Sequence, residues 1–342
     1  MNKNAFIALI QAGISVIWLG FSQPVSAFKV DFNLTGTNSD QETALGQAAQ
    51  IWENILLDDI IVNINISFAD MGSSSIIGGT SSTLYYADFG DVKNQLNIDR
   101  TSDADTSAVG YINALPTTGL GENLSFWSNS PSGEDDLLYA SSDIFGTQAN
   151  LKALGYTGFT GPDASVEFNT KFAFDYDRSD GIDSLEMDFV GVAAHEIGHA
   201  LGFVSSVDSN LWYYQNYGYD NALPPSILDL YRHTDEHGAG EIDISYDGSD
   251  GWFSYDTALI IDMSDGGLGS DGRQASHWAD YSELGMMDPT ASYGELLDLT
   301  YNDILAFDVV GYDVISTPGP ASMLLLGSGL VVLAGFRRKF KK

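Results

Sequence analysis

A pair of histidines with a glutamate between them is the segment of this sequence best suited to chemistry. His195, Glu196 and His199 lie in the stretch HEIGHALGF, which follows the HExxH pattern. On a helix, residues four apart lie one above the other on the same face, so the two imidazoles can bind one metal ion. Glu196 projects to the side of that pair, where its carboxylate can act as a general base. The spacing therefore predicts a zinc site that includes its own base.

A third ligand has to come from elsewhere in the chain. A catalytic zinc site ordinarily has three protein ligands and one water. The metzincin pattern HExxHxxGxxH/D is matched as far as Gly202, but the position of its last ligand is occupied by Ser205. The strict metzincin pattern therefore fails. The remaining candidates are Asp208, Glu236, His233, His237 and His277.

His233 and His237 have the same spacing as the first pair, which would suit a second metal on a helix. The polar residues between them and Gly238 after them favour a loop instead. We therefore expect a loop without a metal at this position.

The zinc pair requires a helix, and the flanking residues indicate where it begins and ends. We expect it to begin near residues 185–188 and to end at Gly202, which can adopt a positive φ and turn the chain away. Apolar residues at helical spacing predict a helix at 41–57, capped by Ser39 or Asp40.

Further elements are expected on both sides of the zinc helix. Alternation predicts strands at 60–68 and 165–176, and a short helix is expected at 147–154. A last helix should begin after Thr300 and stop at Gly311.

The composition is that of an acidic protein with a sizeable core. The 342 residues are 44% hydrophobic and carry a formal net charge of −33. Only eight of the 14 basic residues lie between the two ends of the chain, together with all 47 acidic residues. Such a surface repels nucleic acid and anionic membranes, so we expect no nucleic-acid partner. Because there are no cysteines, zinc must be held by histidine and carboxylate.

Both ends are predicted to be targeting segments around one domain at residues 28–314. Residues 1–27 contain Lys3, an uncharged apolar run and small residues before position 28, which is the pattern of a signal peptide. A transmembrane anchor is the competing interpretation of this leader. Residues 315–342 contain a 16-residue uncharged stretch followed by a basic cluster, which is typical of a membrane tail. We therefore expect an exported protein of the periplasm, outer surface or medium, associated with the membrane through its tail before processing.

The tail resembles the PEP-CTERM sorting tail of exopolysaccharide-producing Gram-negative bacteria. It has a Pro318-Gly319-Pro320 motif, a hydrophobic span and an Arg-rich end, with Gly319 at the position usually held by Glu. The resemblance implies that the export machinery and a sorting transpeptidase are partners.

The rest of the chain resembles the PEP-CTERM-tailed bacterial metalloproteases and the leishmanolysin-like metallopeptidases. In the latter, an insertion separates HExxHxxGF from a third histidine in an HW pair, and a methionine turn follows. Here His277 precedes Trp278, 78 residues after His199, and Met287 lies in the segment MMDP. The resemblance implies an α+β, metzincin-like domain of two lobes around a central active-site helix. It also implies roles for particular residues, namely zinc ligation by His195, His199 and His277, general-base catalysis by Glu196, and an apolar floor beneath the zinc formed by Met287. An ordinary core methionine is the alternative for Met287.

Four aspartates before the zinc helix suggest a second kind of metal. Asp175, Asp177, Asp180 and Asp183 are closely spaced carboxylates of the type that calcium prefers, although the EF-hand spacing does not fit. A solvated acidic turn is the alternative.

Together these features predict an exported zinc-dependent endopeptidase that hydrolyses protein or peptide substrates with a zinc-activated water. The alternatives are a non-proteolytic surface or biofilm-matrix protein that retains a structural metal site, and a zinc hydrolase with a different substrate. A structural site has no use for a base beside its ligands, so Glu196 favours an enzyme.

Overall fold

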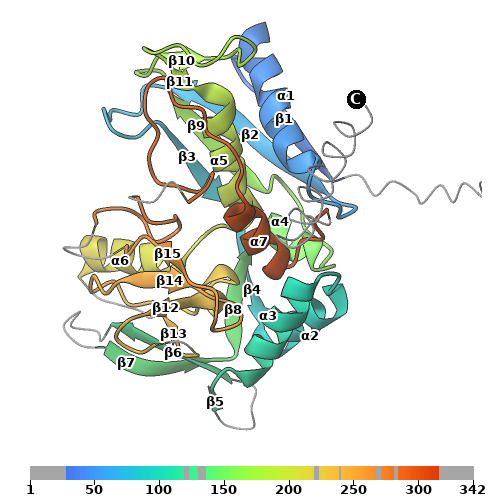
Figure 1. The fold of residues 1–342 in the computed structure, drawn as a ribbon, viewed down its shortest axis with the longest axis vertical. Helices are drawn as coiled ribbons and strands as arrows, with labels where there is room; N and C mark the ends of the chain where they lie inside the picture. The colour runs from blue at the N-terminus through green and yellow to red at the C-terminus, as the bar shows by residue number, and fades with distance from the viewer. Residues whose placement is uncertain are drawn as a thin grey trace, which may run out of the picture.

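A computed structural model describes residues 28–118, 123–129, 136–218, 223–238, 240–266, 271–280 and 284–315. The predicted signal peptide and residues 316–342 of the predicted tail lie outside the described residues. In the part that is described, seven α-helices combine with several small sheets (Figure 1). The fold class is therefore mixed α and β, as expected. None of the helices described is long and apolar enough to cross a membrane.

The sheet nearest the helix that carries His195 and His199 has the strand order β1-β2-β9-β3. β1 (Lys29–Leu34), β2 (Ile61–Ala69) and β9 (Ala164–Asn169) are parallel, and β3 (Gly78–Ser82) runs antiparallel to β9 at one edge. The parallel pairs need helical crossovers, and the chain between β1 and β2 contains a helix.

The two faces of β2 follow the alternation in the sequence. Val62, Ile64 and Ile66 are buried in the core. On the other face, Asn65 accepts a hydrogen bond from Asn33 at 3.0 Å and contacts the next strand. Because side chains alternate in a strand, one face supplies the core and the other carries polar pairs. The predicted strand at 60–68 is confirmed.

Two helices pack against one another beside this sheet. They are α1 (Ser39–Glu53) and α5 (Phe189–Leu201), and α5 also packs on β3. Asn38, one residue before the expected caps, caps α1 by accepting from two backbone amides. The indole of Trp52 is fully buried and donates to the carbonyl of Ala194 at 2.9 Å. This contact links α1 directly to the backbone of α5.

Both ends of α5 have identifiable caps. Asp188 is the N-cap, and its carboxylate accepts from Gly191 at 3.1 Å and from Arg178 at 2.7 Å. Gly202 is the C-cap with φ of 128°, a conformation that L-residues with side chains rarely adopt. The predicted end of the helix is confirmed, and the helix begins at Phe189, one residue after the expected range.

Most of the other elements form the second half of the molecule, which lies below the main sheet in Figure 1. β10 and β11 lie in the upper half instead, and α7 lies between the two halves. The remaining helices are α2 (Phe89–Asp99), α3 (Asp103–Ala114), α4 (Gln148–Ala153), α6 (Ser206–Tyr217), the 3-10 turn η1 (Leu228–Tyr231) and α7 (Tyr301–Val309). The remaining strands are β4 (Leu84–Asp88), β5 (Thr117–Thr118), β6 (Asn123–Asn129), β7 (Asp136–Ser141), β8 (Asp143–Thr147), β10 (Phe174–Asp175), β11 (Met187–Asp188), β12 (Arg232–Thr234), β13 (Ile242–Asp243), β14 (Gly251–Phe253) and β15 (Ile261–Met263).

The expected strand at 165–176 is wrong at its centre. β9 ends at Asn169, whose side-chain oxygen accepts from Lys171 and whose amide donates to the carbonyl of Ile76 at 2.7 Å. These bonds turn the chain before β10 begins at Phe174. The expected helix at 147–154 is present as α4, and α7 begins after Thr300 as expected.

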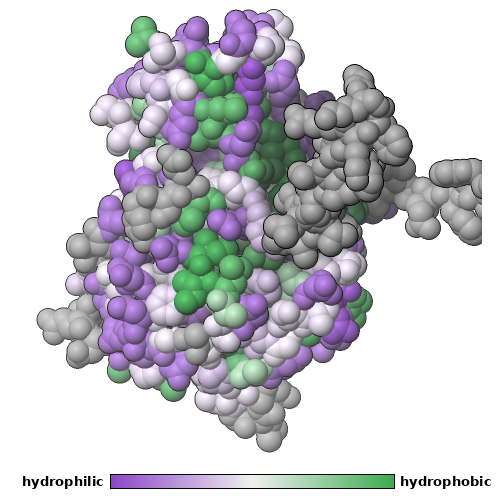
Figure 2. Space-filling model, viewed as in Figure 1, coloured by the Kyte–Doolittle hydropathy of each residue, from purple (hydrophilic) through white to green (hydrophobic). Residues whose placement is uncertain are grey.

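Hydrophilic residues cover most of the face shown in Figure 2, and hydrophobic residues gather in its upper and middle parts. This distribution fits a chain in which acidic residues far outnumber basic ones.

Candidate metal centre

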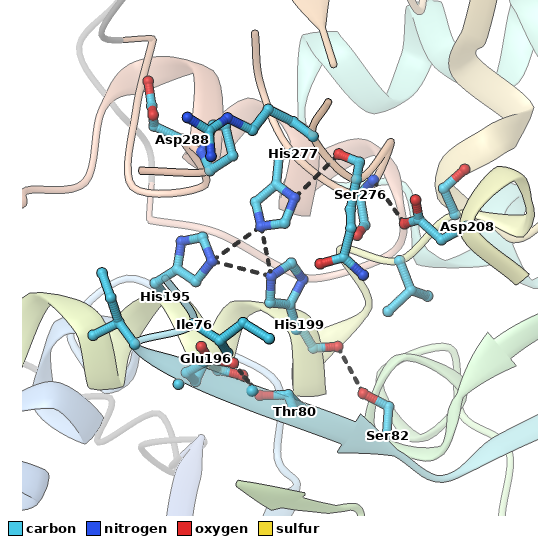
Figure 3. A pocket seen from close by; sticks show the side chains of 18 of the residues that line it. Ile76, Thr80, Ser82, His195, Glu196, His199, Asp208, Ser276, His277 and Asp288 are labelled. Carbon is cyan, nitrogen blue, oxygen red and sulfur yellow. Dashed lines mark hydrogen bonds between the residues drawn. The ribbon is translucent and has the colours of Figure 1, made fainter. Parts of the chain in front are cut away.

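Three histidines from two segments of the chain meet on one face of α5. His195 and His199 project from the helix, and His277 approaches from the loop that follows β15 (Figure 3). The Nε2 atom of His199 lies 3.1 Å from that of His195 and 3.2 Å from that of His277, and the third pair is 3.2 Å apart. The structure therefore brings together the three residues that were expected to bind zinc.

The opposite nitrogen of each ring fixes which nitrogen carries the proton. The Nδ1 atoms of His195, His199 and His277 lie 2.8, 2.7 and 3.1 Å from backbone carbonyl oxygens. Because a carbonyl oxygen only accepts, each Nδ1 must donate, and each Nε2 is left with a lone pair. Three lone pairs that face one another repel unless a cation lies among them.

The donor set also fits zinc. Zinc binds imidazole nitrogen at about 2.0–2.1 Å, so tetrahedral ligands stand about 3.3 Å apart. The observed separations of 3.1–3.2 Å are close to this value. The carbonyls that accept from Nδ1 are the usual outer partners of metal-bound histidine.

Burial keeps the three imidazoles neutral. Desolvation lowers the pKa of His195, and desolvation together with His195 lowers the pKa of His199 to about 3. Desolvation likewise lowers the pKa of His277 well below its ordinary value, followed by the effect of the neighbouring histidines. Neutral imidazole is the form that binds metal, so the site is ready for a cation at neutral pH.

Asp208, one of the alternative third ligands, positions the His277 loop instead. Its carboxylate accepts from the backbone amides of Ala275 at 2.7 Å and Ser276 at 3.0 Å. These bonds hold the segment immediately before His277, as Figure 3 shows. Ser205, at the position of the short pattern's third ligand, caps α6 by accepting from the amide of Val207.

The other candidates lie away from this group. His233 is on β12, fully buried, with Nε2 3.0 Å from the hydroxyl of Tyr111 and Nδ1 2.9 Å from the carbonyl of Glu241. Glu236 and His237 belong to the turn between β12 and β13 and form a different cluster. The loop expected around His233 and His237 is thus a strand followed by a turn.

Glu196 points towards β3 on the side of the histidine pair. Its Oε2 accepts from the hydroxyl of Thr80 at 2.6 Å. Burial raises the pKa of Glu196 to about 7, and the Thr80 hydrogen bond opposes this shift. A pKa near neutrality suits a group that takes and returns a proton. A Cβ at Gly78 would stand 2.9 Å from Glu196 Oε1, so a larger residue at this position would require the carboxylate to shift.

Met287 lies beneath the histidine pair. It is fully buried, and a Cβ at Gly198 would overlap its sulfur. The preceding residue, Met286, supplies the carbonyl that accepts from His195. The carboxylate of Asp303 accepts from the amides of both methionines, at 2.7 and 3.1 Å. The predicted methionine turn is therefore packed against α5 and held by the N-terminal turn of α7.

A pocket of about 770 Å³ opens beside the three histidines and Glu196. β3 lines it on one side, and residues 272–274, 276–277 and 288–291 line it on the other. β3 is the last strand of its sheet, and edge strands present backbone donors and acceptors that can pair with another chain. The arrangement can therefore hold an extended chain across the metal group.

The four aspartates expected to bind calcium do not all converge. One carboxylate oxygen each of Asp175, Asp183 and Glu186 lies within 4.8 Å of the other two, and the sequence did not single out Glu186. Asp177 and Asp180 are outside this group. The two oxygens of Asp175 accept from the backbone amides of Asp177 and Asp183, both at 2.9 Å, and so shape the turn. Calcium binding here stays a prediction.

Comparisons of the chain with protein-family models, with curated proteins and with solved structures found no significant match. The residues and their geometry are therefore the basis on which function is inferred.

Proposed function

We propose that this protein is an exported zinc-dependent endopeptidase. One observation carries the proposal: three Nε2 atoms lie 3.1–3.2 Å apart while the protons of the same rings are committed to backbone carbonyls. That arrangement leaves three lone pairs for one cation, and Glu196 stands beside them as a base. His195, His199 and His277 would hold the zinc.

The chemistry divides between the metal and this chain's own residues. Zinc, when bound, supplies a Lewis acid that polarises a carbonyl and acidifies water. Glu196 accepts the proton of the attacking water and passes it to the leaving amine. The Thr80 hydroxyl, 2.6 Å away, holds one oxygen of Glu196 and leaves the other for that proton.

The shape of the pocket favours a peptide as the substrate. An extended peptide can add to the edge of β3 through backbone hydrogen bonds and so lie along the pocket. Recognition of this kind depends on the main chain, which supports an endopeptidase rather than a hydrolase of small molecules.

We extend the proposal to the metzincin-like, two-lobed architecture and to the route of export. Met287 beneath α5 supports the leishmanolysin-like assignment, since it comes ten residues after the third histidine. Residues 1–27 would direct export, and residues 315–342 would be the anchor that a sorting transpeptidase processes.

The test is cleavage of a mixed peptide library by the purified protein, with and without a zinc chelator. We expect cleavage that stops with chelator and returns with zinc. Glu196→Ala should lower the rate by about 100- to 10,000-fold while zinc stays bound, because Glu196 is a base and not a ligand. A wild-type protein that binds one zinc in the histidine group and cleaves no peptide would favour the non-proteolytic matrix protein.

A further inference from the structure

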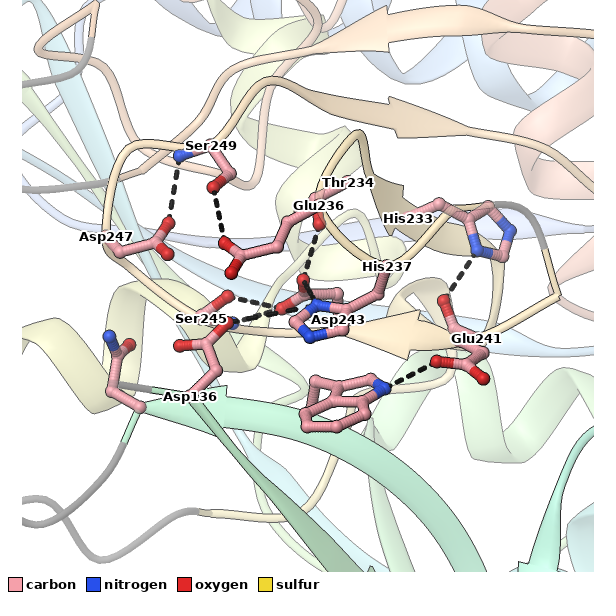
Figure 4. Close-up of polar contacts among 12 residues, drawn as sticks. Asp136, His233, Thr234, Glu236, His237, Glu241, Asp243, Ser245, Asp247 and Ser249 are labelled. Carbon is pink, nitrogen blue, oxygen red and sulfur yellow. Dashed lines mark hydrogen bonds and ion pairs between the residues drawn. The ribbon is translucent and has the colours of Figure 1, made fainter. Parts of the chain in front are cut away.

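A second group of metal-binding side chains lies at one end of the small sheet formed by β6, β7 and β13. β6 pairs with β7 so that Asn129 faces Asp136, and with β13 so that Trp127 faces Asp243. The start of β7 and the end of β13 therefore flank the same end of β6. The turn between β12 and β13 brings His237 to this end (Figure 4).

One atom from each of Asp136, Glu236 and His237 lies within 4.8 Å of the other two. His237 Nδ1 is 3.9 Å from Asp136 Oδ2 and 2.8 Å from the carboxylate of Asp243. The ring of Trp127 stacks on the imidazole at 4.0 Å and 15°. The histidine is thus held in one orientation, with three carboxylates around it.

Asp136 is the buried carboxylate of this cluster with the fewest hydrogen bonds from the described residues. Its side chain is 5% exposed, and neither carboxylate oxygen accepts a hydrogen bond of ordinary distance and angle, although a looser contact with the side chain of Ser245 lowers its pKa. Asp243 is also buried, but its oxygens accept from the amide of Ser245 at 2.9 Å and from the hydroxyls of Thr234 and Ser245. A buried carboxylate without donors is costly unless a cation lies next to it.

No basic side chain supplies that cation. The ion pairs that lysine and arginine form in the described residues are all made with other carboxylates. Within this cluster, an ionised Asp136 can be balanced by a proton on His237 or by a bound metal.

We propose that Asp136, Glu236 and His237 form a second zinc site, separate from the three-histidine group. One imidazole and two carboxylates are a donor set that zinc accepts, whereas calcium prefers oxygen ligands alone. Asp243 lies next to the histidine as the outer carboxylate that orients a ligating imidazole. The ion would join the β12–β13 turn to the start of β7 and thereby stabilise this half of the molecule.

Zinc stoichiometry of the full chain, measured after dialysis against buffered micromolar zinc, separates the two sites. Wild type should retain two zinc ions. His277→Ala should retain one, Asp136→Asn should retain one, and the double variant none. Asp247→Asn is the matched control, because it removes a neighbouring negative charge but no ligand, and it should retain two.

Two further measurements keep the proposal falsifiable if Asp136→Asn does not fold. Glu236→Gln changes an exposed side chain and should weaken binding of the second zinc at least tenfold in a calorimetric titration. Zinc added to the His277→Ala variant should raise its melting temperature, and Glu236→Gln should abolish this shift. If His277→Ala binds no zinc below millimolar concentration, His237 is a protonated partner of the two aspartates and the second site does not exist.

Discussion

Thr80 is the residue next to the metal group whose importance the sequence conceals. Its hydroxyl donates to the Glu196 carboxylate at 2.6 Å and lies 2.9 Å from the carbonyl of the same residue. The side chain of Thr80 therefore links the edge strand β3 directly to the proposed base. Nothing in the segment GGTSS marks this threonine, because its partner is 116 residues away.

Thr80→Val should lower kcat of the proposed peptidase by roughly 10- to 100-fold while zinc content stays the same. The substitution keeps the size of the side chain but lets the base move, and small displacements of catalytic groups have effects of about this size. Ser82→Ala is the matched control on the same strand. Its hydroxyl donates to the carbonyl of His199 and does not contact Glu196. Equal effects of the two substitutions on kcat would show that Thr80 only stabilises β3.

His277→Ala should lower affinity for the proposed catalytic zinc by more than 100-fold and abolish the proposed peptide cleavage. The two remaining histidines come from one helix and leave a ligand position open. His233→Gln provides the control, since His233 is equally buried but contacts Tyr111 and a backbone carbonyl. It should destabilise the fold without changing zinc affinity at the three-histidine group. Competition with a fluorescent chelator measures the zinc affinity of both variants.

For single residues, the sequence predicts the site residues of α5 well and predicts the residues that position them poorly. His195, Glu196 and His199 are recognisable because helical periodicity links their spacing to their geometry. His277 required a resemblance to a known family. Asp208 was weighed as a ligand, yet it holds the His277 loop through backbone amides. Such roles depend on tertiary contacts for which a single sequence carries no periodic signal.

Gly198 is a residue of α5 that matters for packing around the site, although it has no side chain of its own. It lies between the two helical histidines, facing the Met287 sulfur and the ring of Trp52. A glycine normally weakens a helix interior by about 1 kcal/mol relative to alanine. Here it allows the methionine turn and α1 to pack directly against the helix backbone.

Gly198→Ala should lower the free energy of unfolding by about 1–3 kcal/mol, because the added methyl overlaps buried atoms of Met287. Gly46→Ala in α1 is the matched control. No atom lies within 4 Å of a Cβ at that position, so the substitution should stabilise the protein by about 0.4–1 kcal/mol. Urea denaturation measures the free energy of unfolding of both variants. Stabilisation by both would mean that Met287 does not pack on α5.

The elements that were predicted from the sequence are those with strong local signals. α7 begins with a capping box formed by Thr300 and Asp303, and α5 stops at a glycine with positive φ. The strands β12 to β15 were not predicted, because they have only two or three residues each. Alternation cannot be recognised over so few positions, and pairing between distant segments decides their structure.

Considered as a whole, the molecule carries a large excess of negative charge, some of which is buried. Asp58, Asp99 and Asp313 come from three separate parts of the chain, and one oxygen of each lies within 4.8 Å of the others. Burial, followed by the charge of Asp313, raises the pKa of Asp58 to about 7 and that of Asp99 to about 8. Folding therefore brings together carboxyl groups that repel one another when they ionise.

Without divalent cations, stability should fall as the pH rises from about 4 to 8. Unfolded aspartate has a pKa of about 3.9, so within this window the native state holds protons on Asp58 and Asp99 that the unfolded chain has lost. Asp99→Asn should flatten the decline and raise the melting temperature at pH 8 by roughly 2–4 °C for each kcal/mol of repulsion relieved. Asp103→Asn, at an exposed position of α3, should leave the slope unchanged. Thermal unfolding with chelator at several pH values measures this, and a steeper decline for Asp99→Asn would contradict it.

The distance along the chain between the second and third histidines has a consequence for chain entropy. A metal that joins His199 to His277 closes a loop of 78 residues, which contains α6 and the strands from β12 to β15. This protein has no cysteines, so such a metal cross-link would take the place of a disulfide. For loops of this length a cross-link contributes roughly 4 kcal/mol to the free energy of unfolding. Removal of the proposed zinc should therefore loosen this loop first. Limited proteolysis should cut within residues 205–276 much faster after chelation, while cleavage within residues 28–118 changes little.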